Sequence, residues 1–218
     1  MLIEIWSDVA CPFCYVGKRH LEAALAQFAH ADEVEVRWRS FQLAPDMPTD
    51  LGLGMDEMLA EKYGKSIEEA RAMQQRVTNM AAAAGLEFQL DRGRPTNTFD
   101  AHRLIHMAAA YGLQDAAKER LLAAYFIEGE LISDHETLTR LGSEIGLDAG
   151  LVRDILAGDD LTESVNADIA AAREFGLSGV PAFVFDRELL ISGAQPVEQL
   201  LAALEQQYAH AQAGQPQR

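Results

Sequence analysis

The only two cysteines of the chain lie three residues apart, in the run Cys11-Pro12-Phe13-Cys14. Thiol–disulfide exchange requires one thiolate to attack a disulfide and a second thiol close enough to resolve the mixed disulfide. Side chains three apart on a helix are neighbours on one face. The spacing therefore fits dithiol chemistry, with Cys11 attacking and Cys14 resolving. On spacing alone, half of a four-ligand zinc site remains the alternative, with His20 as the only nearby histidine.

The residues around the pair predict that Cys11 stands at the start of a helix. Residues 2–6 form a short strand-like run, and residues 7–10 form a turn. Pro12 suits the first helical turn, because its missing N–H would be unsatisfied there and its φ is already helical. Free N–H groups and the helix dipole stabilise an anion at that point, so we expect a lowered pKa at Cys11. Phe13 adds no positive charge, which predicts a less oxidising pair than a basic residue there would give.

The next cation along this helix is Lys18, on the same face as Cys11. It lies seven residues on, or about 10 Å along the axis. That separation exceeds the Debye length of about 8 Å at physiological salt. We therefore expect the helix terminus, rather than Lys18, to set the pKa of Cys11.

The order of the predicted elements gives the fold class. Residues 33–39 alternate apolar and polar and predict a second strand, parallel to the first across the helix. Residues 55–175 show helix after helix with glycine stops, and residues 182–185 and 189–192 return to strands. A last helix follows Pro196. The chain is thus predicted as α/β, a thioredoxin-like fold with a large all-helical insertion between its β-α-β and β-β-α halves.

This order also predicts a domain organisation. A discontinuous thioredoxin-like domain would comprise residues 1–50 and 176–210, and residues 51–175 would form a helical insertion subdomain. Residues 211–218 would be a flexible tail.

Composition excludes several classes of function. A formal net charge of -16 disfavours nucleic acids and anionic membranes as partners. No apolar run approaches the roughly 20 residues of a membrane span, and the N-terminus lacks the pattern of a signal peptide, so we expect a cytoplasmic protein. Two cysteines cannot supply a disulfide framework.

Large apolar side chains outside the motif are interpreted mainly as core. Trp6 and Trp38 lie on strand faces that should pack together. Met55, Met58 and the pair Met73 and Met80 have the spacing of a helix interior, although methionine-rich surfaces also bind varied peptides.

A second motif adds a family resemblance. Residues 178–184 read Ser-Gly-Val-Pro-Ala-Phe-Val, and together with residues 7–15 they resemble the DsbA-like family of thioredoxin-fold proteins. The resemblance implies that Pro181 is cis and faces the cysteines. It also implies that Val180 offers its backbone to an extended substrate. Further runs resemble the FrnE-like cytosolic branch of this family, at residues 41–45, 97–104, 124–129 and 192–196.

That branch is similar in fold to kappa-class glutathione transferases and 2-hydroxychromene-2-carboxylate isomerases. These relatives carry Ser in place of Cys11 and use glutathione, and the kappa class holds it with an Asp-Arg pair where this chain reads Ala-Gln-Pro at residues 194–196. The resemblance places the helix near residue 100 in a cap over the cysteines. Asn97, His102 and Arg103 are therefore expected to line the substrate cleft. His102 and His106 lack a third ligand, so no metal is expected.

Three functions follow as hypotheses. The first is a cytosolic thiol–disulfide oxidoreductase that reduces or isomerises disulfides of proteins or small thiols through Cys11 and Cys14, without a cofactor. The second is a glutathione-dependent isomerase or transferase acting on a small aromatic substrate, with glutathione as co-substrate. The third is a holdase-like chaperone in which the cysteines are incidental. The oligomeric state is not specified by the sequence.

Overall fold

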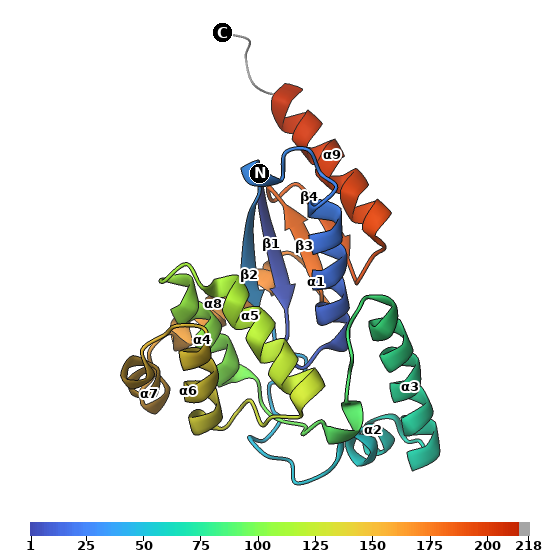
Figure 1. Cartoon of the computed structure of the whole chain (residues 1–218), viewed down its shortest axis with the longest axis vertical. Coiled ribbons are helices and arrows are strands. Elements are labelled where there is room, and N and C mark those ends of the chain that lie inside the picture. Colours follow the sequence, from blue (N-terminus) through green and yellow to red (C-terminus); the bar gives the residue numbers. More distant parts are fainter. Residues whose placement is uncertain (214–218) are drawn as a thin grey trace.

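The computed structural model describes residues 1–213 of the chain. A four-stranded sheet with the order β2-β1-β3-β4 forms its centre, and helices surround it (Figure 1). The N-terminal elements are β1 (Leu2–Ser7), α1 (Pro12–Leu25), the short helix η1 (Ala31–Glu33) and β2 (Glu35–Ser40). The insertion contains α2 (Met55–Tyr63), α3 (Ile67–Ala83), η2 (Leu90–Arg92), α4 (Phe99–Ala109), α5 (Gln114–Ala123), the π-helical η3 (Ala124–Glu128), α6 (His135–Glu144), α7 (Ala149–Ala157) and α8 (Thr162–Glu174). The C-terminal elements are β3 (Ala182–Phe185), β4 (Leu189–Ser192) and α9 (Val197–Ala213).

The pairing of the strands confirms the predicted fold class. β1 runs parallel to β2, with Ile3 opposite Val36 and Ile5 opposite Trp38. β3 runs antiparallel to both β1 and β4. The sheet is therefore a β-α-β unit followed by a hairpin, with the helical segment inserted between β2 and β3.

Each face of the sheet packs on different helices because strand side chains alternate between faces. Ile5 and Phe183 join the main core with residues of α1 and α9, such as Leu204. On the opposite face, Trp6 packs with Ala172 of α8, and its indole N–H donates to the Asp168 carbonyl oxygen at 2.8 Å. Trp6 and Trp38 are both buried, as predicted, but they lie on opposite faces of the sheet, so the expectation that their strand faces pack together is wrong.

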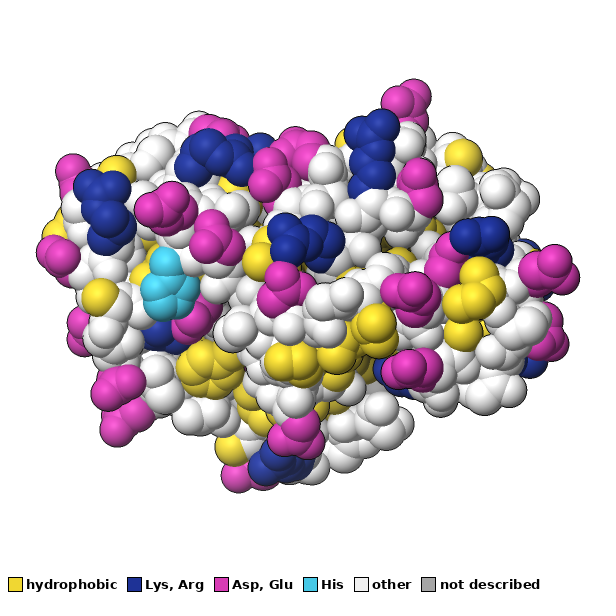
Figure 2. Space-filling view, turned by 90° about the horizontal axis from the view of Figure 1, so that it is seen from below, with side chains coloured by type: hydrophobic (Ala, Val, Ile, Leu, Met, Phe, Trp, Pro, Cys, Tyr) yellow, Lys and Arg dark blue, Asp and Glu magenta, His cyan; other side chains and the backbone are white. Residues whose placement is uncertain are grey.

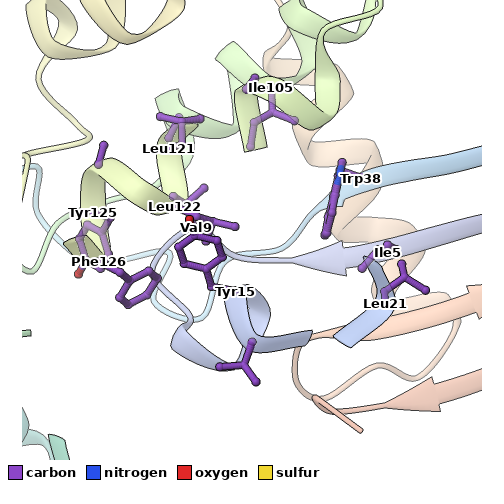
Figure 3. Close-up of a cluster of buried hydrophobic side chains, with 14 of the residues drawn as sticks. Ile5, Val9, Tyr15, Leu21, Trp38, Ile105, Leu121, Leu122, Tyr125 and Phe126 are labelled. Atoms are coloured by element: carbon purple, nitrogen blue, oxygen red, sulfur yellow. The ribbon is translucent and has the colours of Figure 1, made fainter. Parts of the chain in front are cut away.

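The helical insertion gathers at the end of the sheet where β1 ends and α1 begins (Figure 1). Figure 3 shows Tyr15 of α1 beside Leu122 and Phe126 of the insertion, and the rings of Tyr15 and Phe126 lie 6.4 Å apart. One hydrophobic cluster contains side chains of both the sheet and the insertion. Because the two parts share this core, packing alone does not separate them, and the division into two domains remains a prediction.

Two predicted boundaries are wrong. The second strand begins at Glu35 rather than residue 33, because Ala31–Glu33 close a turn of 3-10 helix before it. Of the predicted tail, residues 211–213 continue α9, and residues 214–218 lie outside the described part. Within residues 1–213, no helix has the length and apolar character needed to cross a membrane.

Candidate active site

The turn between β1 and α1 places the first cysteine at a helix terminus. Cys11 is the N-cap of α1, with extended backbone angles of φ -99° and ψ 112°, and Pro12 occupies the first helical turn. The N–H of Cys14 donates to the Cys11 carbonyl oxygen at 3.0 Å. Both cysteines are free thiols. The local sequence thus forms the strand–turn–helix that was predicted from Pro12 and the apolar periodicity.

The two thiols differ in access. Cys11 contributes to the wall of a large cavity and keeps 2% of its surface exposed. Cys14 is fully buried behind it and is absent from the cavity wall. Only Cys11 can therefore meet a ligand in the cavity, whereas Cys14 can reach only Cys11.

A loop before β3 lies against Cys11. The Val180–Pro181 peptide bond is cis, as the resemblance implied. The Cys11 Sγ lies 3.5 Å from the carbonyl oxygen of Val180. Gly17 of α1 lets Pro181 approach, because a Cβ at Gly17 would lie 3.0 Å from the Pro181 Cγ. The fold thus brings together three predicted site residues, Cys11, Val180 and Pro181, from opposite ends of the chain.

The two thiols ionise as a pair. The hydrogen bond to Cys14 and burial raise the pKa of Cys11 well above its ordinary value. Burial by itself raises the pKa of Cys14, but the hydrogen bond from Cys11 and the positive charge of Lys118 outweigh it, so that this pKa is lowered. The direction at Cys11 is thus opposite to the lowered pKa that its place at the helix start predicted, because the two thiols are buried together and share one ionisation.

An acidic residue lies buried in the turn before the pair. Asp8 accepts from the N–H of Leu43 at 2.8 Å, and its other oxygen lies 3.3 Å from Nε2 of His102. Burial opposes ionisation of Asp8, but the hydrogen bond from His102 and the charge of its ring hold the pKa of Asp8 below its usual range. Burial lowers the pKa of His102 despite the attraction of Asp8. His102 thus lies behind Asp8 and orients it rather than facing the cavity.

A buried lysine from the insertion completes this layer. Lys118 of α5 is 1% exposed, its Nζ lies 3.4 Å from the Ser7 carbonyl oxygen, and it faces the Trp38 ring at 5.5 Å. Among residues 1–213, no carboxylate lies within 4.0 Å of this ammonium. Burial lowers its pKa, although the charges of Cys14, Asp8 and Cys11 act in the opposite direction.

The cavity beside Cys11 has a volume of about 610 Å³ and a mainly apolar wall. Figure 2 views the end of the molecule where α2 and α3 lie and shows hydrophobic side chains exposed in a band across it, flanked by charged ones. Phe13 is 44% exposed and belongs to the wall. The wall also contains all four methionines that were interpreted as core, Met55, Met58, Met73 and Met80. That interpretation holds in part: Met55 and Met80 are half-buried and pack against the main core as well as lining the cavity, whereas Met58 and Met73 line the cavity without joining that core.

Besides His102, two more predicted substrate-binding residues, Asn97 and Arg103, do not reach this cavity. The Asn97 amide nitrogen donates to the carbonyl oxygens of Pro45 and Met47 at 3.0 and 2.9 Å, which fixes the loop after β2. Arg103 is buried and donates to backbone carbonyl oxygens at residues 155, 158 and 160, at the end of α7. Both side chains are engaged in structural hydrogen bonds and neither lines the cavity. The expectation that they line the substrate cleft is therefore wrong.

Sequence reasoning missed Asp8 and Lys118 as parts of the site. Asp8 stands in the turn three residues before Cys11, where a short polar side chain can cap the helix start, and this position was the available signal. Lys118 shares helical spacing with Leu121, Leu122 and Tyr125, all buried, so the period of α5 and η3 placed it on the buried face.

The histidines offer no metal site. His106 contacts Ser40 Oγ at 3.1 Å and Asp168 Oδ2 at 3.0 Å through the same Nε2, one turn of α4 beyond His102. Throughout the described part of the chain, no three His, Cys, Asp or Glu side chains form a group able to hold a metal ion.

Comparison with known proteins adds to this geometry. Residues 2–205 match the model of the DSBA-like thioredoxin domain. The chain belongs to this DsbA-like family. Its sequence is 28% identical over 194 residues to the uncharacterized protein YwbO of Bacillus subtilis (strain 168), and the match covers 88% of this chain and 90% of YwbO.

Solved structures place the chain within the DsbA-like fold. A probable DsbA oxidoreductase from Streptomyces coelicolor is 40% identical, with a TM-score of 0.93, over 100% of this chain and 93% of the other. The fold alone is shared with the cytosolic disulfide reductase DsbM from Pseudomonas aeruginosa with GSH (20% identity, TM-score 0.67, covering 96% of this chain and 100% of DsbM). It is also shared with a 2-hydroxychromene-2-carboxylate isomerase (17% identity, TM-score 0.71, covering 99% and 100%). The chain is thus a DsbA-like oxidoreductase by family, with a Cys-x-x-Cys pair.

Proposed function

We propose that this protein is a dithiol–disulfide oxidoreductase in which Cys11 is the nucleophile and Cys14 the resolving thiol. The observation that carries the proposal is the asymmetry of the pair. Cys11 borders the cavity, whereas Cys14 is fully buried behind it and can reach only Cys11. The two thiols ionise as a pair, so Cys14 is placed to take up the proton that Cys11 loses as it attacks.

The reaction then follows from access. The Cys11 thiolate attacks one sulfur of a bound disulfide, forms a mixed disulfide and expels the other sulfur as a thiolate. Cys14, whose pKa is lowered beside Lys118, attacks the Cys11 sulfur and releases the second thiol. The N–H of Val180 has no acceptor among residues 1–213, which leaves it available to an extended substrate. Asp8 and His102 orient the turn that carries Cys11.

We propose that the reaction takes place in the cytoplasm and that the protein reduces the bound disulfide. The name of the distantly similar DsbM, a cytosolic disulfide reductase, supports that choice. The partner would be a disulfide-bearing protein or small molecule.

Trapping experiments test the roles of the two thiols. With Cys14→Ser, a mixed disulfide should accumulate at Cys11 and be visible as a mass increase by intact mass spectrometry. With Cys11→Ser, neither the adduct nor disulfide reduction should be detected, and the Cys11→Ser/Cys14→Ser protein serves as the blank. Full disulfide reductase activity of Cys11→Ser would refute the proposal.

A second candidate is a glutathione-dependent isomerase or transferase, favoured by the apolar cavity, which could hold a small aromatic substrate next to Cys11. Turnover would then survive Cys14→Ser. Binding of reduced glutathione to the Cys11→Ser/Cys14→Ser protein, measured by calorimetry, would support this candidate, and absence of heat would exclude it.

A further inference from the structure

The cavity wall is built for an apolar ligand of small-molecule size. Ligand pockets in proteins commonly measure about 300–1,000 Å³, and this cavity, at about 610 Å³, falls within that range. Five methionines line it: Met47, Met55, Met58, Met73 and Met80. Methionine side chains are flexible and polarisable, so such a wall adapts to apolar groups of different shape.

Two cations of α2 and α3 also line the cavity, Lys62 and Arg76. Both are exposed, and among residues 1–213 neither has a carboxylate within 4.0 Å. Other cations nearby are paired: Lys65 with Glu69, and the α3 residue Arg71 with Asp56. The chain has a net charge of -16, so acidic side chains are abundant, yet among residues 1–213 neither cavity cation forms an ion pair with one. The two cations outnumber Asp8, the one acidic residue on the described cavity wall, so this part of the wall attracts an anion.

Cys11 marks a third point on the same wall. A ligand that fills the cavity and reaches Cys11 combines an apolar body, an anionic group and a sulfur–sulfur bond. Oxidised glutathione matches the charge but not the apolar wall, because most of its surface is amide and charged groups that would lose water there.

We propose that the cavity selects low-molecular-weight disulfides that carry an apolar body and a carboxylate or similar anion, with the methionines contacting the body and Lys62 and Arg76 the anion. This inference rests on the proposed function for its redox step. In that step the Cys11 sulfur bonds to one sulfur of the disulfide RS–SR′, and R′S⁻ leaves. Cys14 then bonds to Cys11 and RS⁻ leaves, so the dithiol is oxidised, the ligand is reduced to two thiols, and the two cysteine protons pass to the products.

Binding can be measured without any redox chemistry. In the Cys11→Ser/Cys14→Ser protein, two fluorescent probes are titrated: the anion anilinonaphthalene sulfonate and the neutral N-phenylnaphthylamine. Adding Lys62→Gln and Arg76→Gln should weaken the affinity for the anionic probe about 5-fold and leave the affinity for the neutral probe unchanged. Adding Met58→Gln should weaken both probes about 5-fold, because an amide then faces the apolar ligand. The matched control is Arg153→Gln, an exposed α7 cation outside the cavity wall, which should change neither.

Selectivity is then measured in single turnover with pre-reduced protein and no added reductant. The rate constant is determined for dithiobis(nitrobenzoate), hydroxyethyl disulfide and oxidised glutathione. Each is compared between the wild type and the Lys62→Gln/Arg76→Gln variant, so that the intrinsic reactivity of each disulfide cancels. We expect a loss of about 5-fold for the aromatic carboxylate and none for the neutral disulfide.

The outcomes separate the inference from the proposed function. If the anionic probe binds the Lys62→Gln/Arg76→Gln protein as tightly as its parent, or Met58→Gln leaves both probes unaffected, the inference is overturned. A disulfide-bonded peptide that reacts faster than every small disulfide and displaces neither probe also overturns it. If probe binding behaves as expected but Cys11 exchanges with no disulfide, the binding site stands and the proposed function fails.

Discussion

Replacing Lys118 with methionine removes a buried positive charge beside the dithiol while keeping a side chain of similar length. Lys118 is 1% exposed and has no carboxylate within 4.0 Å among residues 1–213. Its charge acts instead on Cys14, Asp8 and Cys11. We expect Lys118→Met to raise the pKa at which the reduced pair first ionises, because the Cys14 thiolate loses the attraction that opposes its burial.

The magnitude follows from the general effect of a nearby opposite charge on a pKa. An opposite charge within about 4–6 Å shifts a pKa by about one to three units. Each unit is worth about 1.4 kcal/mol and lowers the thiolate fraction about tenfold at pH values below the pKa. The reduced form loses the same stabilisation, so the reduction potential should become more negative by up to about 30 mV per unit.

The same substitution should stabilise the fold. Burial is the largest influence on Lys118 and lowers its pKa below the ordinary value of 10.5. A lysine with a lowered folded-state pKa costs stability when it is charged, and the cost fades only as the pH rises through that pKa. At neutral pH, Lys118→Met should therefore increase the free energy of unfolding by about 1–3 kcal/mol.

The assay combines thiolate absorbance against pH in the reduced protein with urea unfolding. Lys18→Met is the matched control, since Lys18 is equally buried but is paired with Glu22, Asp115 and Glu119, which raise its pKa despite burial. The control should lose stability and leave the thiolate titration unchanged. If the titration of Lys118→Met coincides with that of the wild type, Lys118 does not set the ionisation of the pair.

Three further substitutions test other parts of the site. Gly17→Ala brings a Cβ to 3.0 Å from the Pro181 Cγ, so it should lower the free energy of unfolding in urea by about 1–3 kcal/mol and slow the reduction of a model disulfide. A wild-type rate of reduction would show that this contact does not affect catalysis. Arg103→Ala should lower the free energy of unfolding by about 3 kcal/mol or more, because three carbonyl oxygens lose a charged donor. The rate of disulfide exchange by the folded protein should be unchanged, and a slower rate would support a role for Arg103 in substrate binding. Asp8 loses its stabilising contribution as the pH falls from its ordinary pKa of 3.8 through its lower folded-state pKa, and Asp8→Asn should remove this part of the acid destabilisation. Acid unfolding is followed by circular dichroism, and a curve for Asp8→Asn that coincides with that of the wild type would contradict the expectation.

Local patterns were sufficient to predict the fold class. The apolar runs at residues 2–6 and 182–185, the alternation in residues 33–39 and Pro12 at the helix start specified a β-α-β unit and a closing hairpin, and the strand pairing agrees. Boundaries were less well specified. Residues 33 and 34 continue the alternation of the second strand, yet a turn of 3-10 helix takes residue 33.

The sequence by itself also determined the chemical pair, because the spacing of Cys11 and Cys14 and the proline between them are local properties. How the two thiols ionise was decided only by the tertiary structure. The contact with Cys14 and burial raise the pKa of Cys11, and Lys118, from a helix about a hundred residues away, helps to lower the pKa of Cys14 against its burial. The methionines of α2 and α3 line a cavity for the same reason: helical periodicity shows which side chains share a face, but only packing against the other elements decides whether that face meets the core or a ligand.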